Sequence, residues 1–285
     1  MNSLTNSAVY TILKNMEDVA LLICGFIVGM LGALLGIGGG VIIVPTLVLL
    51  FGFSMHSAIA ASLVAIIATS STATAHNIKT GMVDLDFGIS LELIASICAM
   101  AGSIISISLN GRFVSVIFSI TLFVTALIYY FKRNIEISPI RAEQKSNLFS
   151  GNFFDPSKQK IVYYSAQHLV PTFIISGLAG FISGMLGVGG GIFKVPAMNL
   201  VSKLPIKAVA ATSNLMVGIT ALSGAIIYFK SGYLSPKIAS IIIIGVVFGS
   251  KFTLWKFRKI TDKRIKLIFM LFLIFVSIEM LIKAI

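Results

Sequence analysis

One glycine-rich break occurs twice in this chain, and it constrains the fold more than any other feature. Residues 35–45 read LGIGGGVIIVP and residues 186–196 read LGVGGGIFKVP, so seven of eleven positions agree at an offset of 151 residues. Inside a helix, glycine costs about 1 kcal/mol and proline about 3 kcal/mol relative to alanine. We therefore expect an apolar helix to be interrupted at the same place in each half of the chain.

The composition around these breaks predicts an all-α, polytopic integral membrane protein. Of the 285 residues, 57% are hydrophobic and 11% are charged, whereas soluble domains carry about 25% charged residues. The net charge of +12 is explained by basic residues beside membrane spans, so we expect a lipid bilayer and no nucleic acid as partner. Cys24 and Cys98 lie apart in apolar segments, and we expect no metal site or cofactor.

Apolar segments divide the chain into two halves of about five segments each, eight to ten in total. We expect a first transmembrane repeat over 1–131, a polar cytoplasmic linker over 132–167 and a second repeat over 168–285, with 1–18 polar and irregular. Outside the breaks, 58–62 parallels 208–212, 79–81 parallels 230–232, and 102–103 parallels 249–250. The predicted segments are 19–36, 41–52, 57–76, 87–109 and 113–131, then 168–188, 192–202, 207–229, 235–255 and 265–284.

The distribution of basic residues favours two inverted repeats. If all five segments of a half cross the membrane, most lysines and arginines lie on the linker side. If only four cross, the halves are parallel and the basic residues divide almost evenly. Because basic residues accumulate in cytoplasmic loops, we predict inverted repeats with both termini outside. The sequence leaves open whether the short segments 41–52 and 192–202 cross fully or re-enter.

The two breaks are the predicted binding site for a small anion. Exposed backbone within a membrane is tolerated only against protein or a water-filled cavity, and the amides that start a helix attract anions. The alternative is that the glycines only allow close helix packing; matching prolines in both copies favour the functional interpretation. The predicted residues are Gly36, Gly38, Gly39, Gly40, Pro45, Gly187, Gly189, Gly190, Gly191 and Pro196.

Lys194 is where the two breaks differ chemically, because its counterpart is Ile43. A cation in the first turn of a helix opposes the helix dipole unless an anion lies between them. The alternative is that the lysine extends to the membrane surface. Glu92 and Glu279 are lone acids in apolar runs, which either couple protons or lie near enough to a helix end to be solvated. Further candidate substrate-binding residues are Asn199, Thr212, Ser213 and Asn214.

The duplicated glycine-proline motifs, the alanine-rich third segment and the Lys-x-Gly turn resemble the sulfite exporter TauE/SafE family of probable membrane transporter proteins. The resemblance covers about 20–131 and 170–284. It implies transport of small sulfur-containing anions, such as sulfite, sulfoacetate or thiosulfate, across the cytoplasmic membrane. It carries over to Gly36–Gly40 and Gly187–Gly191 with Pro45 and Pro196. Family members are usually drawn with about eight spans, so a count of ten departs from that picture.

Together these features predict a secondary transporter in a bacterial-type inner membrane, and not an enzyme. We expect alternating access, in which the repeats move against each other around a central anion site. Gly36-x-Gly38 lacks the third glycine of a dinucleotide motif, and the chain shows no other nucleotide-binding motif. Transport is therefore expected to be driven by an ion gradient, with H⁺ or Na⁺ as the coupling ion, or by the membrane potential, or else to be passive. A small-ion channel and a non-transporting membrane assembly protein are the alternatives. The oligomeric state is left open.

Overall fold

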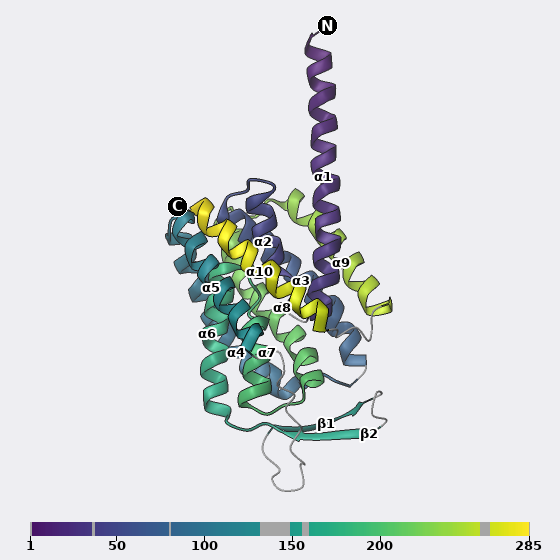
Figure 1. Ribbon diagram of the computed structural model, residues 1–285, viewed down its shortest axis with the longest axis vertical. Helices are drawn as coiled ribbons and strands as arrows, with labels where there is room; N and C mark the ends of the chain where they lie inside the picture. Colours follow the sequence, from purple (N-terminus) through teal and green to yellow (C-terminus); the bar gives the residue numbers. More distant parts are fainter. Residues whose placement is uncertain are drawn as a thin grey trace.

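The computed structural model describes residues 2–35, 38–79, 81–131, 149–155, 160–256 and 263–284. The first half contains α1 (Asn2–Leu35), α2 (Gly40–Leu49), α3 (Met55–Lys79), α4 (Leu85–Ser108) and α5 (Gly111–Phe131). A hairpin of β1 (Ser150–Asp155) and β2 (Lys160–Ser165) follows. The second half contains α6 (Leu169–Leu186), α7 (Gly191–Pro196), the π-helical η1 (Ala197–Val201), α8 (Ile206–Lys230), α9 (Pro236–Lys256) and α10 (Lys263–Ala284) (Figure 1).

Seven of the described helices are long and apolar enough to cross a membrane: α1, α3, α4, α5, α6, α8 and α9. Large apolar side chains are exposed along them, such as Leu93 and Ile97 on α4 at 65% and 70%. Exposed leucine and isoleucine in such numbers suit contact with lipid tails rather than water. The prediction of a polytopic, all-α membrane protein is confirmed.

The first helix of each half packs against a helix of the other half, and the first such pair is α1 with α9. Along α1 and α9, Gly25 meets Ile242 and Gly29 meets Val246, so these two helices run parallel. Glycine allows this approach, because a Cβ on Gly29 would lie 2.3 Å from the Val246 carbonyl oxygen.

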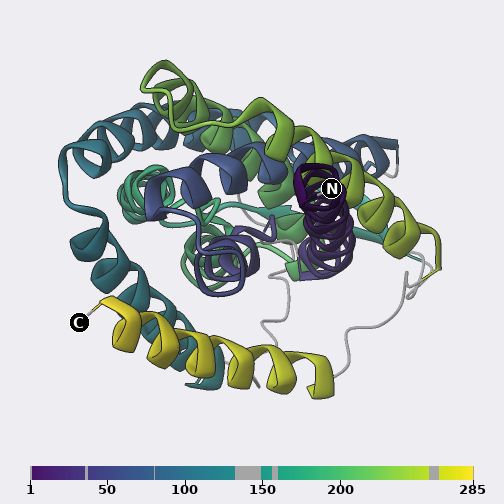
Figure 2. The ribbon, with the colours of Figure 1, turned by 90° about the horizontal axis from the view of Figure 1, so that it is seen from above.

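The equivalent pair, α6 and α4, packs in the same way. A Cβ on Gly180 would lie 2.2 Å from the carbonyl oxygen of Ala95, and Gly184 meets Ala99. The first helix of each repeat therefore packs against the fourth helix of the other repeat, and α6 runs in the opposite direction to α1 (Figure 1). In the view from above, α5 and α10, the last helices of the two repeats, lie together along one edge (Figure 2).

These contacts keep one constant offset of 151 residues between the halves. Gly29 and Val246 correspond to Gly180 and Ala95, which pack alike. Two of the sequence pairings were therefore shifted: 58–62 matches 209–213 rather than 208–212, and Gly102 corresponds to Thr253. Small residues recur so often in these helices that sequence identity alone does not define the register.

The short segments re-enter rather than cross. At the end of η1, Ser202 accepts a hydrogen bond at its carbonyl from the amide of Gln167 (3.1 Å). Its hydroxyl also lies 2.7 Å from that of Thr172, in the first turns of α6. The segment α7–η1 thus returns to the end of the bundle from which α6 starts. In Figure 1, α2 likewise returns toward the side from which α1 descends. The chain changes direction at the glycine break and again after the short helix, so α3 runs in the same direction as α1 (Figure 1). The halves are therefore inverted although the short segments do not cross, and the expectation that such segments give parallel halves is wrong.

The hairpin covers one end of the bundle, within the predicted linker; residues 132–148 of that linker lie outside the described residues. Val162 and Tyr164 face inward and pack with Phe87 and Leu204. The Tyr164 hydroxyl donates to Asp84 Oδ2 (3.0 Å), and Asp84 caps α4 by accepting from the amide of Phe87 (3.1 Å). Both chain termini lie toward the opposite end (Figure 1). We call these the hairpin end and the terminal end.

The start of the chain differs from the prediction. Residues 1–18 were expected to be irregular, but α1 begins at Asn2 and projects beyond the other helices (Figure 1). Residues 2–24 contain neither glycine nor proline, and an existing helix extends at little cost because nucleation is the unfavourable step. The polar composition of this stretch therefore did not stop the helix.

Candidate functional site

Glycine is required at both breaks by the backbone conformation. Gly38 and Gly39 have φ values of 78° and 80°, and Gly189 and Gly190 have values of 83° and 70°. Residues that carry a Cβ atom are disfavoured in this left-handed region, whereas glycine adopts it at little cost. Each pair therefore ends one helix and starts the next, as predicted. Gly36, the first glycine of the first break, lies outside the described residues.

The two breaks lie on either side of one contact, where α3 crosses α8. A Cβ on Gly38 would lie 2.8 Å from Val217 Cγ1 and 3.0 Å from Ile66 Cγ2. A Cβ on Gly189 would meet the same two side chains at 2.9 Å and 3.3 Å. Ile66 on α3 and Val217 on α8 are themselves equivalent by the repeat offset. The crossing therefore marks the pseudo-twofold centre of the protein.

The breaks also touch each other directly. Ser62 on α3 donates a hydrogen bond to the Gly187 carbonyl (2.7 Å). A Cβ on Gly40 would lie 2.3 Å from the same carbonyl oxygen, so Gly40 and Gly187 pack backbone against backbone. The predicted meeting of the two glycine motifs at the repeat interface is thus present in the structure.

The first amides of the short helices are partly satisfied within the breaks. Ile42 and Ile43 donate to the Gly39 carbonyl (3.0 and 3.2 Å), and Phe193 and Lys194 donate to Gly190 (3.1 and 3.0 Å). The amides that could bind a ligand are therefore those of the glycines in each break and of the first residue after them, Val41 or Ile192. Pro45 is buried within α2, and Pro196 ends α7 where the backbone becomes π-helical.

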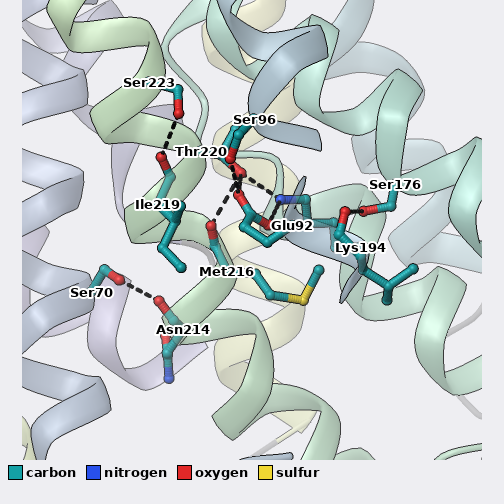
Figure 3. Close-up of polar contacts among 11 residues, drawn as sticks. Ser70, Glu92, Ser96, Ser176, Lys194, Asn214, Met216, Ile219, Thr220 and Ser223 are labelled. Carbon is teal, nitrogen blue, oxygen red and sulfur yellow. Dashed lines mark hydrogen bonds and ion pairs between the residues drawn. The ribbon is translucent and has the colours of Figure 1, made fainter. Parts of the chain in front are cut away.

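Lys194 forms a buried ion pair with Glu92 close to this centre (Figure 3). Its Nζ lies 2.6 Å from Glu92 Oε2 and 2.5 Å from Thr220 Oγ1. The Thr220 hydroxyl also donates to Glu92 Oε1, and Ser96 lies 3.5 Å from the same oxygen. The lysine and glutamate side chains are 0% and 2% exposed. The cluster joins α4 of the first repeat to α7 and α8 of the second.

This pair corrects two interpretations of the sequence. Lys194 does not extend to a membrane surface, since its charged end is enclosed within the protein. Glu92 is not solvated near a helix end, and it supplies the anion that a lysine at this position requires. Sequence reasoning considered the two residues separately, although the rule that intramembrane charges pair with one another could have linked them. Glu279, the other lone acid, is partly exposed.

The equivalent position in the other repeat carries no charge. The repeat offset makes Ile43 the counterpart of Lys194 and Ile243 the counterpart of Glu92. Thr220, the third residue of the cluster, has a threonine as its counterpart, Thr69. Thr69 donates to the Ala65 carbonyl (3.0 Å) as Thr220 does to the Met216 carbonyl (3.1 Å). The fold is therefore built at one site with isoleucines and at the other with an ion pair.

The other predicted polar residues are not gathered around Lys194. Asn199 donates to the Leu204 carbonyl (2.8 Å), and Thr212 accepts from the Asp84 amide (2.9 Å), which ties both to the hairpin end. Asn214 accepts at its backbone carbonyl from Ser70, within the helix crossing (Figure 3). The hydroxyl of Ser213 is buried and has no hydrogen-bond partner among the described residues.

Comparisons with known proteins agree with this architecture. The sequence pattern of the family described as "Sulfite exporter TauE/SafE" matches residues 21–280. "Probable membrane transporter protein YunE" of Bacillus subtilis is 30% identical over 93% of this chain and 98% of its own length. "Probable membrane transporter protein MJ0441" of Methanocaldococcus jannaschii is 25% identical over 87% and 89%. No solved structure matches the chain. The chain belongs to the sulfite exporter TauE/SafE family of membrane transporters.

Proposed function

We propose that this protein is a secondary transporter of small anions, in particular sulfur oxyanions or organosulfonates such as sulfite, working by alternating access. The observation that carries the proposal is the ion pair of Lys194 and Glu92, buried between the repeats at a position where the other repeat has two isoleucines. Burying an ion pair is seldom a gain in stability over apolar side chains. Because the same fold forms the second position without charges, the pair is better explained by function.

The anion site is proposed to comprise the Lys194 ammonium group and the amides of the two glycine breaks. The breaks meet at the centre of two inverted repeats, which is where transporters of this plan bind substrate. In the described conformation, Ile66 and Val217 fill the space between Gly38 and Gly189. Movement of one repeat against the other would separate these contacts and admit an anion from one side at a time.

The hairpin end is proposed to face the cytoplasm of a bacterial-type cell. The linker that joins α5 to the hairpin is rich in lysine and arginine, as is the stretch from 251 to 266. Both connect helix ends at the hairpin end, where the positive-inside rule would place them on the cytoplasmic side. The basic residues of described elements at this end are Lys79, Lys160, Lys203, Lys207, Lys251, Lys256, Lys263, Arg264 and Lys266, against Lys14, Arg112, Lys230, Lys237 and Lys283 at the other.

Counterflow in proteoliposomes tests the proposal. Proteoliposomes that contain the purified protein are preloaded with unlabelled sulfite, thiosulfate, sulfoacetate, sulfate or acetate. Entry of the same anion in labelled form is then followed. We expect saturable exchange with at least one sulfur anion. Lys194→Met should lower the flux about tenfold or more, since a hydrogen bond to a charged group contributes about 1.5–3 kcal/mol. Absence of saturable exchange with every anion would contradict the proposal, and single-channel currents would indicate a channel.

Two further variants make this test specific. Lys237→Met removes a lysine that pairs with Asp18 on the surface (2.7 Å), and its flux should equal that of the wild type. Lys194→Met combined with Glu92→Gln removes both buried charges at once, so that no unpaired charge remains to unfold the protein. This double variant should fold and fail to transport. Wild-type flux in it would exclude Lys194 from the anion site.

A further inference from the structure

We propose that Glu92 is the proton acceptor that couples transport, so that one proton accompanies each anion in the same direction. This inference rests on the proposed function and adds the co-transported ion and the residue that carries it. It follows from the ion pair: the cation that would bind the anion is already paired with a carboxylate from the other repeat.

The first step of the argument is charge balance. The contacts to the Glu92 carboxylate come from Ser96 on α4, Lys194 on α7 and Thr220 on α8. On α6, the neighbouring Ser176 donates to the Leu91 carbonyl instead (3.4 Å). Among these described contacts, Lys194 is the single cation. An anion that takes over the ammonium group would leave a buried carboxylate without a partner, which proteins avoid.

A proton resolves this conflict. Before binding, the site holds the Glu92 carboxylate and the Lys194 ammonium. One proton and one anion enter, the proton forms an O–H bond on Glu92, and the anion pairs with Lys194. The ammonium keeps its protons, and the one bond that breaks is the O–H bond of the hydronium ion that delivers the proton and leaves as water. For a monovalent anion the net charge of the site is zero before and after, and release on the other side reverses both events.

Thr220 allows the protonated acid to remain hydrogen-bonded. Its hydroxyl has one proton and two acceptors within reach: Glu92 Oε1 and the Met216 carbonyl (3.1 Å). When Glu92 is ionised, the hydroxyl can donate to the carboxylate. When Glu92 is protonated, the acid can donate to Thr220, whose hydroxyl then turns to Met216. Thr69 already makes the corresponding bond to Ala65 in the other repeat (3.0 Å), so the second state uses a geometry that this fold accommodates.

The experiment measures protons and anions together. Methanesulfonate, a monovalent organosulfonate that does not titrate near neutral pH, is supplied to proteoliposomes that contain a trapped pH indicator, with the membrane potential clamped at zero. We expect one proton per methanesulfonate in the wild type. An acidic exterior one pH unit below the interior should give about tenfold accumulation, because each tenfold ratio corresponds to about 1.4 kcal/mol. If methanesulfonate is not exchanged in counterflow, a monovalent anion that is exchanged replaces it.

Glu92→Gln imitates the protonated acid and separates the possible outcomes. This variant should retain exchange of labelled for unlabelled anion but lose both proton movement and accumulation. Glu279→Gln, which neutralises the other lone acid, should behave as the wild type. Saturable wild-type flux without proton movement overturns the inference while leaving the transporter proposal intact. Proton coupling that persists in a folded Glu92→Gln also overturns it. Absence of any saturable flux in the wild type contradicts the transporter proposal itself.

Discussion

Lys194 Nζ lies 2.6 Å from Glu92 Oε2, and this bond joins the two repeats through a pair of fully enclosed charges. The two side chains come from α7 and α4, which belong to opposite repeats. Any movement that separates these helices must therefore break the pair or provide each charge with another partner. The pair links the conformation of the bundle to the ions that it holds.

Single removal of either charge should destabilise the protein more than removal of both. Glu92→Ala leaves the Lys194 ammonium buried and unpaired, at a cost of about 3–5 kcal/mol. Combining Glu92→Leu with Lys194→Met imitates the isoleucines at the equivalent position and should restore most of the stability. Thermal unfolding in detergent, compared among the three proteins, measures the effect. A double variant no more stable than the single one would contradict this account.

Gly189→Ala should lower both stability and transport because of the contact at the helix crossing. The new methyl group would lie 2.9 Å from Val217 Cγ1, in addition to the strain of a φ value of 83°. Gly232→Ala is the matched control, since its φ value is 75° and its surroundings are open. Both variants carry a backbone cost of about 1–2 kcal/mol. We expect transport activity to fall in Gly189→Ala and to be retained in Gly232→Ala. Equal losses of activity would contradict a specific role for the contact between Gly189 and the crossing of α3 and α8.

Ser62 and Ser213 occupy equivalent positions but should respond differently to alanine. Ser62→Ala removes the hydrogen bond to the Gly187 carbonyl and should cost about 1 kcal/mol of unfolding free energy. Ser213→Ala removes a buried hydroxyl that lacks a partner among the described residues, so its stability should be unchanged or higher. If Ser213 binds the anion, KM should rise in the counterflow assay. A stability loss in Ser213→Ala equal to that in Ser62→Ala would contradict this distinction.

The hairpin should detach more readily at alkaline pH. Burial, followed by the nearby Asp84 carboxylate, raises the pKa of Tyr164 above its ordinary value. A raised pKa in the folded state stabilises the fold below the unfolded value of about 10, and this contribution declines as pH rises beyond it.

Tyr164→Phe tests the hairpin contact. The variant loses a hydrogen bond to a carboxylate, so it should be less stable at neutral pH by about 1.5–3 kcal/mol. Above pH 10 the stability of the wild type should fall as Tyr164 becomes ionised. The stability of the variant should depend less on pH, because it has no phenol at this position. Limited proteolysis between β1 and β2 as a function of pH measures the difference. Parallel pH curves for the two proteins would show that Tyr164 does not contribute.

Local sequence features predicted most of the fold. The long apolar runs, the low charge content and the two glycine breaks are properties of short stretches, and each has a direct physical consequence in a membrane. Charge distribution then separated inverted from parallel repeats. The sequence left the re-entrant path of α2 and of α7–η1 open, because segments of ten and eleven residues are too short to require a full crossing.

Other features depended on packing. Asn2 begins α1 because a helix extends through polar residues that do not interrupt it. The hairpin forms within a stretch that composition marked as a linker, since Val162 and Tyr164 find a surface at the end of the bundle. Asn199 and Thr212 were grouped with Lys194 by their proximity in sequence, whereas the structure connects them to the hairpin end.

The sequence by itself determined that this is a membrane protein of two related halves, each with one broken helix and with a single lysine making the breaks unequal. Only the tertiary structure decided what that lysine does. Glu92 and Lys194 are 102 residues apart and lie in different repeats, so no local pattern connects them. They meet because the first helix of each inverted repeat packs against the fourth helix of the other. Two opposite charges enclosed together in an apolar interior are also less costly than either one alone.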